Sequence, residues 1–260
     1  MNHANLLCWN VAGRVATLGE QVERVVGYRC DLVCLQEVAS ATAPRWIAAL
    51  RADGHAWVGV AELQRREAAP RRPLSVLIAS RWDAMEVGVE ALPWTERVLA
   101  VRTNGLEVVG VHSPISASPG LAKVLTHEAL HRHLAAGSGP RILCGDLNTP
   151  RKEHPEGEVW TFARDRYGRL REDRGQRWDD AELALIKGLE PFGFRDVYRE
   201  QHGPQGVISW AWGRSRGGYR LDHLIASDEV RVSWVEYLHE WRNDRLSDHS
   251  PLAAELAWPG

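Results

Sequence analysis

The sequence predicts an α/β fold in which mixed β-sheets are faced by helices. Apolar runs of strand length alternate with segments that have helical spacing, which is typical of this class. Several neighbouring apolar runs are joined by short turns. Short turns connect antiparallel strands, so a purely parallel sheet is disfavoured. The chain has 260 residues, 44% of them hydrophobic, and is expected to form one domain over residues 1–260.

Most of the predicted strands lie in the first half of the chain. Residues 17–28 and 41–53 have the apolar spacing of helices. Asn104 and Gly105 stand between two apolar runs and indicate a tight hairpin. The expected strands here are residues 5–11, 31–38, 55–63, 73–80, 85–92, 97–103 and 106–113.

The second half begins with a predicted helix, residues 118–136, and a buried strand, residues 141–147. Residues 151–180 are rich in Arg, Glu and Asp and poor in aliphatic side chains. This charged insertion is interpreted as a solvated segment, with a substrate-contacting arm as the alternative. A helix near residues 180–190 follows it. The remaining expected strands are residues 206–212, 219–227, 230–238 and a last strand after Pro251.

Composition favours a cytoplasmic protein. No apolar stretch is long enough to span a bilayer, so no membrane anchor is expected, and the N-terminus lacks the features of a signal peptide. The four cysteines, Cys8, Cys30, Cys34 and Cys144, lie in or beside apolar runs and are expected to be reduced core residues. The net charge of −2 excludes nucleic-acid binding by bulk charge but leaves a local basic face open. We expect a monomer.

Polar side chains recur where the predicted strands end. A single carboxylate at a strand end is commonplace and usually belongs to a turn. Several at successive strand ends indicate a site, because strand ends in α/β proteins converge on a crevice. The residues are Asn10, Gln36, Glu37, His112, Asp146, Asn148, Asp222, Asp248 and His249.

These residue types favour one chemistry. Carboxylate and amide oxygens are hard ligands suited to Mg²⁺, with Mn²⁺ as the alternative. Asp146 and Asn148 are two residues apart, so in extended backbone they point to the same side. The sequence lacks a nucleophile elbow and a Walker loop. It therefore favours hydrolysis by a metal-assisted water over covalent catalysis.

Six motifs in order carry a resemblance to a known family. "WNVAG", "LQE", "VHSP", "GDLN", "RLDHLIAS" and "SDHSPL" resemble the endonuclease/exonuclease/phosphatase superfamily, the deoxyribonuclease I-like fold, in an exonuclease III-like or related branch. The resemblance runs from Asn10 to His249. It implies a four-layer sandwich of two packed mixed β-sheets flanked by helices. His112 matches deoxyribonuclease I and many phosphatase or lipase members, whereas Tyr219 and Leu221 match the exonuclease III side.

The resemblance also implies roles for the residues that match its motifs. Asn10, Glu37 and Asp248 would lie at the metal. The catalytic set would position the attacking water, hold the phosphate and orient the imidazole that contacts it. Its members are Asp146 for the water, Asn148, His112 and His249 for the phosphate, and Asp222 for the orientation of His249.

The expected function is that of a divalent-metal-dependent phosphoesterase, with DNA phosphodiester bonds as the first choice of substrate. Trp210, Trp212 and Tyr219 could stack on bases, and Arg214, Arg216 and Arg220 would add local positive charge. Arg81 is a further candidate for a phosphate contact, although a surface role is the more common one for a single Arg. The alternatives are a phosphatase or phosphodiesterase acting on a small-molecule or lipid phosphate, and an inactive binding module that retains the fold.

Overall fold

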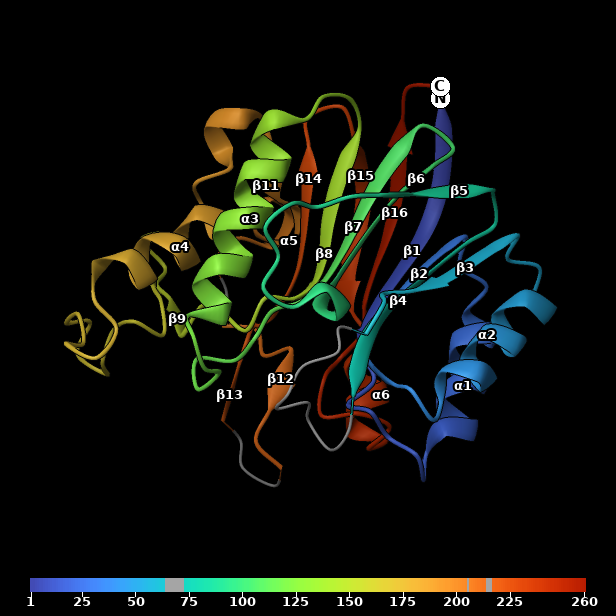
Figure 1. Cartoon of the computed structure of the whole chain (residues 1–260), viewed down its shortest axis with the longest axis horizontal. Coiled ribbons are helices and arrows are strands. Elements are labelled where there is room, and N and C mark those ends of the chain that lie inside the picture. Colours follow the sequence, from blue (N-terminus) through green and yellow to red (C-terminus); the bar gives the residue numbers. More distant parts are fainter. Residues whose placement is uncertain (64–72, 205, 214–216) are drawn as a thin grey trace.

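Two six-stranded mixed sheets pack face to face in residues 1–63, 73–204, 206–213 and 217–260, which the computed structural model describes (Figure 1). The first sheet has the order β15 (Arg231–Tyr237), β16 (Leu252–Trp258), β1 (Asn2–Asn10), β2 (Leu32–Ala39), β4 (Leu74–Ser80), β3 (Trp57–Val60). The second has the order β11 (Phe194–Asp196), β14 (Asp222–Ser227), β8 (Arg141–Asp146), β7 (Leu106–His112), β6 (Val98–Thr103), β5 (Ala84–Val87).

Helices cover the outer face of each sheet, as Figure 1 shows. Those that pack on the first sheet are α1 (Leu18–Tyr28), α2 (Ala43–Ala52) and α6 (His239–Asn243). Those that pack on the second are α3 (Ala122–Ala136) and α4 (Gln176–Ile186). The short α5 (Val197–His202) adds Val197 and Tyr198 to the core between the sheets. The predicted four-layer sandwich is confirmed.

Each sheet contains one parallel strand pair, joined by a helix, and these two units position the polar strand ends. In the first sheet β1, α1 and β2 follow one another, and Asn10 pairs with Gln36. In the second sheet β7, α3 and β8 do the same, and His112 pairs with Asp146. The carboxyl ends of all four strands meet at one edge of the sandwich.

The central strands are buried on both faces, which explains their unbroken apolar runs. In β1, Leu6 and Cys8 face the core between the sheets, whereas Leu7 and Trp9 face the helices. All four cysteines are free and buried, as predicted. None of the described helices is long and apolar enough to cross a membrane.

Three predicted strands are much shorter in the structure. Residues 55–63 and 85–92 contribute only β3 and β5, which lie at the sheet edges and pair on one side only. Residues 206–212 contribute only β12 (Trp210–Ala211), which pairs with β13 (Gly218–Tyr219) outside both sheets. The predicted hairpin at Asn104–Gly105 is confirmed: their φ angles are 47° and 80°, as a two-residue turn with both φ positive requires.

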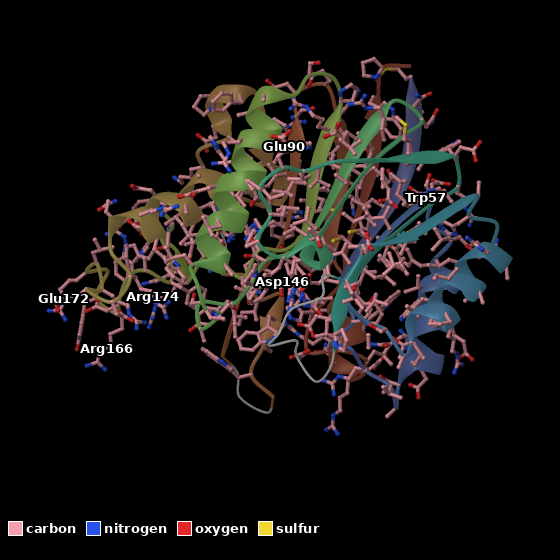
Figure 2. All side chains as sticks on the ribbon, in the orientation of Figure 1. Trp57, Glu90, Asp146, Arg166, Glu172 and Arg174 are labelled. Carbon is pink, nitrogen blue, oxygen red and sulfur yellow. The ribbon has the colours of Figure 1, made fainter. Side chains whose placement is uncertain are left out.

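The charged segment 151–180 contains regular structure. It begins with β9 (Lys152–Glu153), paired with β10 (Val159–Trp160), and runs into α4, which starts earlier than the helix expected near residues 180–190. Its outer part carries exposed ion pairs such as Arg169 with Asp165. In Figure 2, Arg166, Glu172 and Arg174 lie at the far end of this segment, well away from Asp146.

Candidate active site

Asp146 lies at the centre of the cluster of strand-end residues. Its Oδ2 accepts a hydrogen bond from Asn10 Nδ2 at 3.0 Å, and its Oδ1 accepts one from the Asn148 backbone N–H at 2.8 Å. The preceding Gly145 has a φ of 138°, and a Cβ there would lie 2.0 Å from the Val111 carbonyl oxygen. Glycine thus lets β8 approach β7 closely enough to deliver Asp146. Burial raises the pKa of Asp146 to about 7, although His249 pulls it down.

Glu37 reaches Asp146 through an irregularity in β2. The pairing of β2 with β4 shifts register between Leu35 and Val38, and Glu37 has a φ of 57°, in the left-handed region. Such a bulge re-aims a side chain at a cost in backbone strain, which is common beside functional sites. Asn10 Nδ2 donates to Glu37 Oε1 at 3.3 Å, so Asn10 bridges the two carboxylates.

A divalent cation fits this donor set. An oxygen of Glu37 and an oxygen of Asp146 lie within 4.8 Å of each other and of a His112 ring nitrogen. Two carboxylates this close repel one another, and an oxygen-seeking cation between them removes the repulsion. Asp248 lies outside this cluster but lines the same cavity, and its Oδ2 accepts a hydrogen bond from Trp210 Nε1 at 3.0 Å.

His249 and Asp222 form a buried pair beside Asp146. His249 Nδ1 lies 2.8 Å from Asp222 Oδ2, and its Nε2 lies 3.8 Å from Asp146 Oδ2. Burial lowers the pKa of His249, but the charge and hydrogen bond of Asp222 outweigh it and raise the pKa to about 10. The imidazolium therefore donates to Asp222 from Nδ1 and presents its Nε2–H toward Asp146.

His112 is neutral, in contrast to His249. Burial lowers its pKa well below the usual value, and Arg97 lowers it further. The guanidinium of Arg97 contacts the His112 ring, closest to Nδ1, and His112 Nε2 lies 3.3 Å from Glu37 Oε1. Sequence reasoning missed Arg97, which ends the single-turn η1 (Thr95–Arg97) and belongs to no motif.

The cluster opens into a cavity of about 370 Å³ that is lined by both polar and apolar side chains. The polar ones are Glu37, His112, Asp146, Asn148, Asp248 and His249, and the apolar ones include Phe162, Trp210, Tyr219 and Leu221. The Trp210 and Tyr219 rings are nearly parallel, with centroids 6.0 Å apart. Trp212 packs edge-on against Tyr219 and is 45% exposed. Phe162 comes from the charged segment, where sequence reasoning predicted no individual site residue.

A buried ion pair holds the loop that follows β8. Asn148 has a φ of 51°, and its Nδ2 donates to the Ser113 carbonyl at 2.7 Å. The Asn148 carbonyl accepts a hydrogen bond of 2.7 Å from Lys123 Nζ, which also pairs with Glu182 at 2.7 Å. Neither Lys123 nor Glu182 was identified from the sequence, because both lie in ordinary helical patterns.

The larger cavity beside β9 and α5, about 490 Å³, is a poorer candidate. Its charged side chains are engaged with one another: Glu153 pairs with both Arg199 and Arg220. Arg220 is 3% exposed and also contacts Asp196, so it supplies no charge to a substrate.

Arg81 is not brought to the cluster. Its Nη2 pairs with Asp53 at 2.8 Å, and its backbone N–H bonds to Asp31, which precedes β2. Glu37 lies six residues further along the chain, about 20 Å away at about 3.3 Å per residue. The structure therefore does not bring Arg81 to this cluster, and a phosphate contact at Arg81 stays a prediction. Arg214 and Arg216 lie outside the described residues.

Comparisons with known proteins show the family and the fold. A model of the endonuclease/exonuclease/phosphatase family matches residues 7–249. An AP endonuclease from Archaeoglobus fulgidus has a TM-score of 0.70 at 20% identity, covering 98% of this chain and 99% of that one. The 3′ phosphatase NExo from Neisseria, bound to a product DNA hairpin, has a TM-score of 0.71 at 23% identity, with coverage of 98% and 100%.

The similarity extends to a third kind of protein. TDP2 from D. rerio, complexed with a single-strand DNA product, has a TM-score of 0.68 at 15% identity, and covers 99% of this chain and 100% of that one. No curated protein matches the sequence. At these identities the solved structures establish the shared fold.

Proposed function

The chain belongs to the endonuclease/exonuclease/phosphatase family, and we propose that within this family of phosphoester hydrolases it cleaves phosphodiester bonds of DNA. One observation carries the proposal. The buried Asp146 carboxylate is surrounded by Asn10, His112 and His249, and the cavity that it lines is also lined by the aromatic side chains of Phe162, Trp210 and Tyr219. The polar side chains suit a phosphate, and the aromatic side chains suit a base or sugar beside it.

Different residues of the chain would have different roles in hydrolysis. Asp146 has a pKa of about 7, so its carboxylate can take a proton from an attacking water near neutral pH. The charged His249 offers its Nε2–H to a phosphoryl oxygen, and the neutral His112 offers a second N–H. A divalent cation, Mg²⁺ or Mn²⁺, held by Glu37 with Asn10 and Asp248 nearby, would neutralise the negative charge that develops on the phosphate.

Substituting Glu37 tests the metal site. Glu37→Gln keeps the shape of the side chain but removes a charged oxygen ligand, so we expect a sharp loss of Mg²⁺-dependent cleavage without loss of folding. Excess chelator should abolish wild-type activity, and Mg²⁺ should restore it. Glu90→Gln is the matched control, because Glu90 is exposed and lies far from Asp146 in Figure 2. Wild-type cleavage that persists undiminished in chelator would contradict the metal-dependent mechanism.

A substrate panel separates the nuclease from the phosphatase alternative. Tyr219→Ala should weaken DNA cleavage by about 5–150-fold, equivalent to the about 1–3 kcal/mol of one stacked base, and leave a small alkyl phosphate, which has no ring to stack, unaffected. The panel comprises nicked, abasic and plain duplex DNA, single-stranded DNA and phosphomonoesters. Tyr167→Ala is the control, since Tyr167 is exposed in the outer part of the charged segment. Turnover of a phosphomonoester with no cleavage of any DNA would favour the phosphatase.

A further inference from the structure

Three cysteines meet in the core between the two sheets. Cys8 lies on β1, Cys34 on β2 and Cys144 on β8, and all three are at most 1% exposed. Their three sulfur atoms lie within 4.8 Å of one another. Apolar burial alone does not require thiols at the same point on three strands from two sheets.

The strand pairing explains how the sulfurs come together. Cys8 and Cys34 are direct partners in the parallel pair β1–β2, so their side chains stand next to each other on the inner face of the first sheet. Cys144 reaches them from β8 in the second sheet. Gly110 on β7 leaves room for them, because a Cβ there would lie 2.6 Å from Cys34 Sγ.

A buried amide is directed at the same sulfurs. Gln36 is fully buried, and its Nε2 lies 3.4 Å from Cys8 Sγ and 3.2 Å from Cys34 Sγ. Its Oε1 has no hydrogen-bond partner among the described residues. A buried amide is costly unless satisfied, and N–H donors placed at sulfur favour the sulfur that carries negative charge. Burial raises the pKa of Cys8 well above its usual value, so this thiol keeps its proton until a ligand replaces it, and the Gln36 N–H groups would then favour the sulfurs that carry charge.

We infer that Cys8, Cys34 and Cys144 form a binding site for a thiophilic cation of the Cu(I) class, separate from the oxygen-ligand site of Glu37 and Asp146. Thiolates select soft cations, whereas carboxylates select Mg²⁺. With metal–sulfur bonds of about 2.3 Å, three sulfurs around one ion stand about 4 Å apart, close to the arrangement found. Each thiol that becomes a ligand releases its proton to solvent, and no electron is transferred.

Loading with Cu(I) tests the site. Anaerobic, reduced full-length protein is incubated with Cu(I) in excess Mg²⁺, which occupies oxygen ligands, and then challenged with a chromophoric Cu(I) chelator. We expect one Cu(I) per chain to be retained by the wild type, with a higher melting temperature, because an ion that binds only the folded chain stabilises it. Cys34→Ser and Cys144→Ala should each lose both effects.

Two control variants distinguish the cysteine trio from other residues that could bind Cu(I). Cys30→Ser should keep the ion, because Cys30 is buried but lies outside the trio. Glu37→Gln should also keep it, which makes the result independent of the proposed nuclease activity. Retention that is equal in wild type and Cys34→Ser, or absent in wild type, would overturn the inference. X-ray absorption of the loaded wild type checks it without any variant: three sulfur neighbours are expected, and a nitrogen or oxygen shell would refute the site.

Discussion

Cleavage by the His249→Ala variant should be at least about 10²-fold slower than by the wild type at saturating Mg²⁺, with little change in substrate binding. The loss of a single charge-stabilising donor costs about this much when the charge develops only in the transition state. Asp222 holds the imidazole by a 2.8 Å hydrogen bond and keeps its pKa raised, so Asp222→Asn should slow the same step. Single-turnover rates measure the chemical step directly.

The double variant decides whether the two residues act as one unit. If Asp222 works through His249, combining Asp222→Asn with His249→Ala should be scarcely worse than His249→Ala alone. His133→Ala is the matched control. His133 also pairs with a carboxylate, that of Glu107 at 2.8 Å, but Glu107 lies at the end of β7 opposite to His112. Rate losses that multiply in the double variant would show that Asp222 and His249 act independently.

The residues that sequence reasoning placed together share one local signal. Asn10, Glu37 and Asp146 each follow an apolar run, and the carboxyl ends of the parallel strands β1, β2, β7 and β8 meet. A polar residue at the end of a buried strand is visible in the sequence without knowledge of the partners. Arg81 also follows an apolar run, but β4 runs antiparallel to β2, so its end lies at the opposite edge. Strand direction was the missing information.

Other site residues carry no local signal. Arg97 meets His112 because β6 and β7 form a hairpin, and Phe162 enters the cavity from a segment whose composition predicts solvation. The lengths of the edge strands β3 and β5 were overestimated for a related reason. Apolar periodicity extends beyond β3 and β5, but each of these strands lies at a sheet edge and pairs with one neighbour only. Each of these features depends on pairing that sequence pattern alone does not specify.

The buried Lys123–Glu182 pair should give the largest effect on stability. Lys123→Met would leave the Glu182 carboxylate buried without its cation, and breaking one side of a buried pair costs about 3–5 kcal/mol. Burial raises the pKa of Glu182, but the Lys123 charge and hydrogen bonds from Lys123 and Thr149 hold it below its usual range. Burial lowers the pKa of Lys123 in turn, and the contact with Glu182 opposes that shift, so denaturant unfolding of the variant measures what the ammonium contributes.

The double variant Lys123→Met with Glu182→Gln should recover part of that loss, because no unpaired charge remains buried. Lys187→Met is the control: Lys187 is exposed at the end of α4, and its removal should change stability by no more than about 0.5 kcal/mol. Lys123 also donates to the Asn148 carbonyl, so cleavage by folded Lys123→Met should slow as the loop loosens. A loss of stability below about 1 kcal/mol would contradict a charged pair at this position.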